Sequence, residues 1–477
     1  MGKDNDDAFA RELMRRSPLA GAVLEASDFV LDDAMLGAVY EANRGRCYED
    51  VLEFPDFLRL LRDALVRHDG SGHRLYLELE ERDEEPVNES NFYRKLARTP
   101  VEVSRALLRT GAARVGELMP QGPQSSQSPV PSCFDGFRVL AADGKKVKNA
   151  AKRLKLTRGY SGKLLGAKAL VAMDVRSGLA VAMSDSLDGE ANDVPLVPAL
   201  LSQLRELSPE VPLLSVWDRQ FDGVSTLRLL SARAGDAYVV RLRDDTRVRF
   251  EPDGPPRVTS DASGRTVTDE VGTLGSGGKN ALRVRRVTLH RDGQDGDDEE
   301  DDVRLVSNLL DAGLFPADAL LALYKRRWGI EQLFQQVTET FGLARLIGSA
   351  PKAVLLQLSV CLLLYDLVQM VKAYVAQDGR VLAAAVSTFY LFLDVKKELT
   401  AWAYHAPDAA AWPRAAGRDA EAMRARLGEL LSGSWKRSYT KASDKRPRRK
   451  PPPTHRIYGG HTSVQRLLEG KARLIKI

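Results

Sequence analysis

The sequence holds few residues of the kinds that build metal–thiolate sites and disulfide frameworks. Its three cysteines, Cys47, Cys133 and Cys361, lie far apart and at no metal-ligand spacing. The six histidines are isolated as well, so neither a zinc site nor a catalytic histidine dyad is predicted. Unpaired, widely spaced cysteines are typical of a reducing compartment, and we expect a cytoplasmic protein.

Long uncharged apolar runs and a secretory leader are also missing. The longest candidate for a membrane span, Ala353 to Val371, contains Gln357, Asp366 and Gln369 and is shorter than a comfortable span. Residues 1–7 are acidic and polar, which is not the pattern of a secretory signal. With 477 residues, 44% of them apolar, the chain is expected to be globular, with two or three domains and no membrane partner.

Charge of both signs is plentiful but segregated. The net charge is only +5, whereas residues 292–302 hold eight acidic residues in eleven and residues 435–455 are dense in Lys and Arg. We expect the acidic run to be a solvated loop and the basic tail to be extended. A segregated basic segment favours a polyanionic partner. For the cluster Lys441–Lys450, a sequence-independent DNA contact and a merely solubilising tail stay equally open.

The hydrophobic pattern divides the chain into six parts. In chain order we predict a helical N-terminal domain, a linker rich in Gln, Ser and Pro, the first part of an α/β core, a β-rich insertion, the second part of the core, and a helical C-terminal region with the basic tail. The corresponding residues are 1–120, 121–134, 135–242, 243–310, 311–375 and 376–477.

A segment of the N-terminal domain, residues 88–108, has the pattern of two helices joined by a turn. Thr99 is expected to cap the second helix, and Pro100 to be its first helical residue. The segment is either a helix-turn-helix that reads DNA or an ordinary pair of packed helices, which is the commoner arrangement. The sequence leaves both alternatives open.

The core is predicted from buried strands and amphipathic helices that alternate along the chain. Strands are expected at 137–143, 169–175, 179–184, 212–218 and 238–242, helices at 194–207 and 223–234, and insertion strands at 247–250, 283–290 and 303–308. Three strands, a helix, a strand, a helix and a strand is the order of the ribonuclease H-like fold. We therefore predict an α/β protein with a ribonuclease H-like core, a β-rich insertion, and helical N-terminal and C-terminal regions.

Two buried strands of this core are predicted to end on aspartates, Asp143 and Asp218. Since the carboxyl edge of an open sheet faces a crevice, the two carboxylates should lie side by side if their strands are neighbours. Each has an ordinary alternative: Asp143, before Gly144, can begin a β-turn, and Asp218 can cap a helix. Asp174 and Asp185 also end strands, but turn chemistry at the hairpin explains both.

A third carboxylate lies on the helix predicted within 316–374. Tyr324, Arg327 and Glu331 are spaced i, i+3 and i+7, so they share one stripe of that helix. An ordinary surface salt bridge between Arg327 and Glu331, worth ~0.3–0.5 kcal/mol, would leave Tyr324 unexplained. Trp328 faces another side of the helix, and we expect it to pack rather than stack on a base.

Three carboxylates from separate elements suit divalent metal chemistry. Hard cations such as Mg²⁺ take oxygen ligands. Two of them held ~3.5–4 Å apart stabilise the attacking and the leaving oxygen of a phosphoryl displacement. Asp143, Asp218 and Glu331 are therefore the candidate catalytic residues and metal ligands.

These motifs resemble those of a known enzyme family. Ala142-Asp143-Gly144, Trp217-Asp218-Arg219-Gln220-Phe221 and the helix with Tyr324, Arg327 and Glu331 are similar to the motifs of bacterial insertion-sequence transposases with an Asp-Asp-Glu triad. More narrowly, they resemble the insertion-sequence-four family, whose signature is Tyr, two residues, Arg, three residues, Glu, six residues, Lys. The resemblance covers roughly residues 135 to 370, with a β-rich insertion between the second Asp and the Glu.

The sequence departs from this signature at its last position, where Thr338 stands in place of Lys. In the family that lysine contacts DNA phosphate near the active site. Thr338 can donate a hydrogen bond but carries no charge. Gln335 and Lys325 are the candidates to replace the contact.

The resemblance implies a DNA transposase that cuts the ends of an insertion sequence and joins them to target DNA. Asp143, Asp218 and Glu331 would coordinate two Mg²⁺ ions, for which Mn²⁺ can substitute, and the DNA backbone would be contacted by Tyr324, Arg327, Arg219 and Lys325. The implied partners are terminal inverted repeats, target DNA and a second copy of the chain, in a bacterial cytoplasm at the nucleoid. Two alternatives stay open: a nuclease of the same fold that cuts without joining, and an inactive transposase-derived DNA-binding protein.

Overall fold

A computed structural model describes most of the chain. The described residues are 12–47, 51–68, 70–82, 87–121, 129–148, 154–158, 162–243, 249–275, 281–290, 302–339, 347–405, 414–415, 417–441 and 461–471. Most of the predicted linker (122–128), most of the acidic run (291–301) and the basic run (442–460) lie outside the described residues, so the predictions made for them have no counterpart here.

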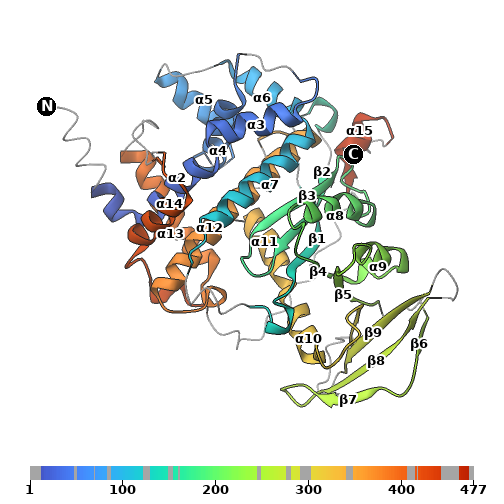
Figure 1. Ribbon diagram of the computed structural model, residues 1–477. Helices are drawn as coiled ribbons and strands as arrows, with labels where there is room; N and C mark the ends of the chain where they lie inside the picture. The colour runs from blue at the N-terminus through green and yellow to red at the C-terminus, as the bar shows by residue number, and fades with distance from the viewer. Residues whose placement is uncertain are drawn as a thin grey trace.

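One mixed sheet of 11 strands forms the centre of the described structure, with helices on both of its faces (Figure 1). Its strands are β1 (Arg138–Lys148), β2 (Leu164–Asp174), β3 (Ala180–Ser186), β4 (Leu213–Trp217), β5 (Ala237–Arg241), β6 (Phe250–Pro252), β7 (Arg257–Ser260), β8 (Thr266–Leu274), β9 (Leu282–Leu289), β10 (Val303–Ser307) and β11 (Thr462–Ser463). They follow the order β11-β2-β1-β4-β5-β10-β9-β8-β6, with β3 paired to β2 and β7 paired to β8. The predicted α/β class is therefore confirmed.

Strand β1 has two partners of different length. It pairs with β4 in parallel only from Arg138 to Ala141, and with β2 in antiparallel fashion from Leu140 to Lys148. Because β2 still provides backbone partners after β4 has ended, β1 continues five residues past Asp143. The prediction that Asp143 ends its strand, or begins a turn there, is wrong.

The predicted β2–β3 hairpin is confirmed, with Gly178 at φ 74° in its turn. The insertion strands are not a separate sheet, because β10 pairs with β5 and so extends the core sheet. Two of them were missed by the sequence reading: β7 is exposed along its whole length, and β8 alternates between buried and partly exposed side chains. Neither strand has the continuous apolar run that marks a buried strand.

The helices before the sheet are α2 (Pro18–Val30), α3 (Asp33–Asn43), α4 (Phe54–Val66), α5 (Gly72–Glu81), α6 (Glu89–Arg98) and α7 (Val101–Glu117). Within and after the sheet lie α8 (Val197–Glu206), α9 (Val224–Leu230), α10 (Ala317–Arg326), α11 (Trp328–Glu339), α12 (Pro351–Asp378), α13 (Thr388–His405), α14 (Ala420–Leu431) and α15 (Val464–Leu468). The prediction of continuous helix over 316–374 is wrong, since α10 and α11 break at Arg327 and residues 347–350 are not helical.

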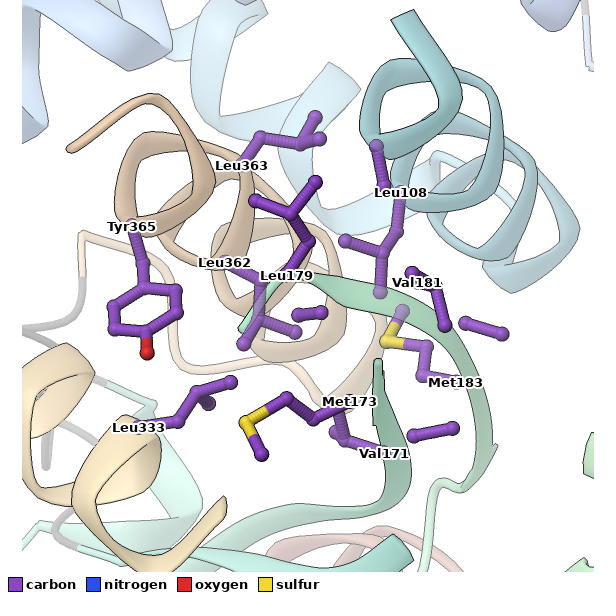
Figure 2. Close-up of a cluster of buried hydrophobic side chains, with 14 of the residues drawn as sticks. Leu108, Val171, Met173, Leu179, Val181, Met183, Leu333, Leu362, Leu363 and Tyr365 are labelled. Atoms are coloured by element: carbon purple, nitrogen blue, oxygen red, sulfur yellow. The ribbon is translucent and has the colours of Figure 1, made fainter. Parts of the chain in front are cut away.

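One face of the sheet packs against three helices (Figure 2). The side chains that meet there come from β2, β3 and the turn between them, and from α7, α11 and α12: Val171, Met173, Leu179, Val181, Met183, Leu108, Leu333, Leu362 and Leu363. Helix α12 is long and apolar enough to cross a membrane, but its apolar window is entirely buried inside the protein. It is the central helix of this core.

Helix α7 approaches α12 so closely that a Cβ at Gly111 would lie 2.6 Å from Leu363 Cδ2. Its buried face includes eight residues along its length, which supports packed helices rather than a DNA-reading helix-turn-helix. The prediction that Thr99 caps α7 is also wrong. Pro100 holds that position, and the Thr99 hydroxyl donates to Lys95 O at 2.8 Å, at the end of α6.

The N-terminal helices share a core with the C-terminal ones. The N–H of Ala20 in α2 donates to Glu398 Oε2 of α13 at 3.0 Å, and Arg426 of α14 lies 3.2 Å from Glu25 of α2. Near the C-terminus β11 pairs with β2 in parallel at the edge of the sheet, and α15 follows β11.

Candidate active site

Asp143 and Asp218 lie at the point where β4 ends beside β1. In the parallel register Ala141 pairs with Val216, and Asp143 and Asp218 each follow this last pair by two residues. The two carboxylates are close enough for the charge of Asp218 to raise the pKa of Asp143. The two strands are neighbours, as predicted. Asp218 leads into the short 3-10 turn Arg219–Phe221 without a capping hydrogen bond from its side chain, so the capping alternative does not explain this residue.

The third carboxylate, Glu331, lies on α11, just after the break that separates this helix from α10. At this break the N–H of Arg327 donates to Tyr324 O at 3.0 Å and the N–H of Ile330 donates to Arg327 O at 3.0 Å. Both bonds span three residues, which is a tighter turn than an α-helix makes. Gly329 lies against the sheet, because a Cβ there would be 2.9 Å from Met173 Cε. The missing side chain lets the start of α11 approach the face on which Asp143 lies.

Arg327 connects the carboxylates. Its Nη2 is 2.5 Å from Glu331 Oε1, and its Nη1 is 3.5 Å from Asp143 Oδ2. The Tyr324 hydroxyl donates to Asp218 Oδ1 at 3.5 Å, and the guanidinium carbon lies 5.7 Å from the centre of the Tyr324 ring. Arg327 is only 8% exposed, so the pair with Glu331 is not an ordinary surface salt bridge. The structure brings the predicted Tyr, Arg and Glu together with both aspartates.

The surroundings of Asp143 disfavour the ionised form of its carboxyl group. The pKa of Asp143 is raised to about 6, mainly by burial and to a smaller extent by the negative charges of Asp218 and Glu331. Two contacts oppose this increase: the N–H of Gly144, 2.8 Å from Oδ1, and the positive charge of Arg327. The site therefore holds more negative charge than Arg327 alone neutralises.

The two non-carboxylate residues keep their protons. Burial raises the pKa of Tyr324, so its hydroxyl acts as a donor to Asp218. For Arg327, burial works to lower the pKa, whereas Tyr324 and the three carboxylates raise it, and the net pKa is above the ordinary value. Its Nε is buried and has no hydrogen-bond partner among the described residues. The guanidinium therefore retains one unsatisfied donor, a group that buried sites normally pair.

The three carboxylates have the chemistry that a divalent cation requires, but Arg327 lies among them. Within the described residues, no three His, Cys, Asp or Glu side chains are close enough together to hold a metal ion. The positive charge among Asp143, Asp218 and Glu331 is instead the guanidinium of Arg327. Oxygen donors that repel each other and converge on a cation are what Mg²⁺ requires. For all three to bind an ion, Arg327 must give up some of its contacts.

The remaining predicted contacts lie at the edge of the site. Arg219 and Lys325 are exposed, and each directly follows a site residue, Asp218 and Tyr324 respectively. Trp328 is 51% exposed, so the prediction that it packs is wrong. Trp328 is the first residue of α11, directly after the helix break at Arg327, and the sequence pattern does not reveal this break.

The two rival aspartates have local partners. Asp174 accepts the N–H groups of Arg176 at 3.0 Å and Ser177 at 3.1 Å, which confirms turn chemistry for it. For Asp185 the turn explanation is wrong, because its carboxylate pairs with Arg105 of α7. Both are therefore structural.

A lysine that the sequence reading did not select lies beside Thr338. The ammonium of Lys145 donates to Thr338 Oγ1 at 2.9 Å and to Phe334 O at 3.3 Å. Gln335, one of the two predicted replacements for the signature lysine, instead bonds Glu339 at 3.1 Å. The available signal was the spacing of Lys145 two residues after Asp143, which puts both side chains on one face of a strand.

Comparisons with known proteins concern the part of the chain that holds this site. Residues 134–367 match the family model of the transposase DDE domain. That range contains Asp143, Asp218 and Glu331, and the match supports a DDE transposase, an enzyme class that cuts and joins DNA. No curated protein matches the sequence. A cryo-EM structure of a piggyBac transposase synaptic complex with hairpin DNA is similar over 90% of this chain and 87% of that chain, at 12% identity and a TM-score of 0.39. A likeness at this TM-score carries no argument about the site of this chain.

Proposed function

We propose that the protein is a transposase that cuts the ends of an insertion sequence and joins them to target DNA by two-metal-ion phosphoryl transfer. The observation that carries the proposal is the meeting of Asp143, Asp218 and Glu331 around Arg327, inside the segment that matches the transposase DDE domain. The three residues come from a strand, a strand end and a helix, and packing for stability alone does not require three carboxylates at one place.

The strand order supports a ribonuclease H-like core for this enzyme. Strands β3, β2 and β1 are consecutive antiparallel neighbours, and β4 and β5 follow beside β1 in parallel. The position of Tyr324, Arg327 and Glu331 at one site supports the narrower assignment to the insertion-sequence-four family. The domain limits given by the sequence pattern, including the insertion at 243–310, are part of the same proposal.

In the proposed mechanism Asp143, Asp218 and Glu331 would hold the divalent ions. When bound, Mg²⁺ supplies charge neutralisation at the phosphate and lowers the pKa of the attacking hydroxyl group. The protein's own contribution is positioning. Tyr324 fixes one oxygen of Asp218 by its hydroxyl, and the N–H of Gly144 fixes one oxygen of Asp143.

Arg327 is the residue that exchanges partners. Its guanidinium contacts Asp143 and Glu331, while its Nε has no partner among the described residues. A phosphodiester offers two oxygens in the geometry of the guanidinium fork. We expect DNA phosphate to draw Arg327 from the carboxylates and so to leave their oxygens available for metal ions.

The partners follow from the same proposal. The DNA substrates would be terminal inverted repeats and target DNA, and pairing of two ends would need two copies of the chain. The exposed residues Arg219 and Lys325 would contact the backbone beside the site. A cytoplasmic, nucleoid-associated location is proposed with them. We assign no DNA-recognition role to the helices at 88–108, because eight residues of α7 are buried against the rest of the protein.

A cleavage assay separates this proposal from its alternatives. The substrate is a labelled DNA duplex that carries the inverted repeats flanking the coding region, with a plasmid as target and Mg²⁺ present. Cutting followed by insertion into the plasmid supports a transposase, whereas cutting alone favours a metal-dependent nuclease. Binding without cutting would indicate an inactive DNA-binding descendant and would overturn the proposal. The matched control is Asp218→Asn, which keeps the side-chain shape and removes the charge.

A further inference from the structure

Lys145 places a second positive charge close to the candidate active site. We infer that Lys145 contacts a phosphate of the bound DNA strand and supplies the charge that Thr338 lacks. The inference rests on the proposed function and adds a residue that neither the triad nor the helix motif contains. The observation behind this inference is that the ammonium of Lys145, a residue of β1, contacts helix α11.

The backbone puts Lys145 on the face of the sheet that holds the carboxylate of Asp143. In β1 these residues are two apart, so their side chains leave the same face. On the neighbouring strand β2, Asp143 is paired with Val171 and Lys145 with Ala169. Lys146, by contrast, points to the opposite face, where its partner in β2 is Lys168.

The ammonium of Lys145 is held along the helix stripe of Glu331. It donates to Thr338 Oγ1 at 2.9 Å and to Phe334 O at 3.3 Å, and it lies 5.2 Å from the centre of the Phe334 ring. Thr338 follows Glu331 by seven residues, which is two turns on the same side of a helix and a rise of about 10 Å. A DNA strand with one phosphate at the carboxylates would reach the next phosphates at this distance.

This arrangement places a positive charge beside position 338, where the family signature has a lysine. A lysine at position 338 would bring its charge from α11, and here the charge reaches the same place from β1. The Lys145 side chain is partly exposed, so its ammonium can exchange one of its contacts on α11 for a phosphate oxygen. Flexible lysine side chains commonly bind phosphate as point charges.

The test measures DNA binding against salt concentration, without divalent cations, for a fluorescein-labelled duplex of random sequence. Lys145→Gln retains donors for Thr338 and for Phe334 O but removes the charge. We expect it to lower the slope of log affinity against log salt by about 1 and to weaken binding by about fivefold to tenfold near 0.1 M salt. Lys145→Arg should keep the wild-type slope, and Lys146→Gln, on the opposite face, should also leave it unchanged.

A charge-relocation variant makes the test specific. In the double variant Lys145→Gln/Thr338→Lys the positive charge returns to the same place from α11, so the wild-type slope should be restored. The inference is overturned if Lys145→Gln binds with the slope of Lys146→Gln. It is also overturned if Lys145→Gln lowers thermal stability and affinity with the slope unchanged, because Lys145 would then only brace α11. If the wild-type protein itself neither binds nor cuts DNA, the proposed function fails, which is a separate result.

Discussion

Arg327 and Asp143 are 184 residues apart in the sequence, yet Nη1 of one lies 3.5 Å from Oδ2 of the other. The same guanidinium is 2.5 Å from Glu331. This contact ties the helix break between α10 and α11 to the middle of β1. The guanidinium thus offsets the negative charge of the clustered carboxylates. Its removal should therefore lower the stability of the folded protein.

Replacement of Arg327 by alanine is expected to destabilise the protein by about 2 kcal/mol at neutral pH. Removing one partner of a fully buried ion pair costs about 3–5 kcal/mol, but the Glu331 side chain is 32% exposed and retains some hydration. Urea unfolding in metal-free buffer measures the change. The matched control is Arg326→Ala, an exposed neighbour that should stay within about 0.5 kcal/mol of wild type. Equal stability of the two variants would refute a stabilising role for Arg327.

The substitution Asp143→Asn should stabilise the metal-free protein at high pH and have little effect at low pH. The pKa of Asp143 is raised to about 6 from an ordinary 3.8, so the folded state binds this proton more tightly than the unfolded state. The penalty for ionisation is absent below about pH 4, grows as the pH rises through 6, and then reaches about 2–3 kcal/mol.

The difference in unfolding free energy between Asp143→Asn and wild type, followed by urea unfolding from about pH 4 to about pH 8, checks this expectation. Asp174→Asn is a control away from the carboxylate cluster, at a carboxylate that accepts two backbone N–H groups in a turn. A pH-independent difference for Asp143→Asn would mean that its carboxyl group is not strained by burial and by Asp218 and Glu331.

Gly144→Ala is expected to lower stability by about 2 kcal/mol or more and to reduce activity by moving Asp143. A Cβ at this position would lie 2.3 Å from Asp193 Oδ1. Asp193 cannot easily move, because its carboxylate is held 2.7 Å from the buried ammonium of Lys168. Overpacking of this kind costs about 1–3 kcal/mol, and loss of the ion pair adds to it.

A second glycine serves as the control for that substitution. Gly116 lies exposed in α7, and a Cβ there would meet nothing within 4 Å. Alanine at a helical position of this kind is expected to stabilise the protein by about 0.5–1 kcal/mol. Thermal unfolding of both variants decides the question. If Gly144→Ala is as stable as Gly116→Ala, the close packing of Asp193 on β1 is incorrect.

The core of the fold could be predicted because its strands are buried on both faces. Continuous apolar runs marked β1, β4 and β5; β4 and β5 are almost wholly buried in the structure, and β1 is buried from Val139 to Ala142. The two aspartates of the site were found by the same reasoning, since the carboxyl ends of parallel strands gather at one edge. The antiparallel extension of β1 beyond Asp143 was not predictable, because it depends on β2, a partner that local pattern does not reveal.

The helical side of the site was predicted only in part. Spacing put Tyr324, Arg327 and Glu331 on one stripe, and the three do meet, but spacing gave no sign of the break at Arg327 or of the exposed Trp328. Lys145 was missed because its contact with Thr338 joins residues that are 193 positions apart. Such a contact depends on how α11 lies on β1, which is a property of the packed fold.

The most direct test of the central claim, that three distant carboxylates act as one catalytic site, is the rate of DNA-end cleavage in Mg²⁺ for Asp143→Asn, Asp218→Asn, Glu331→Gln and the double variant Asp143→Asn/Glu331→Gln. Residues that act as a unit have non-additive effects. We predict that each single substitution lowers the rate by about a thousandfold or more, and that the double variant is no slower than the slower of its two parents. Cleavage near the wild-type rate by any single variant, or losses that multiply in the double variant, would contradict the account.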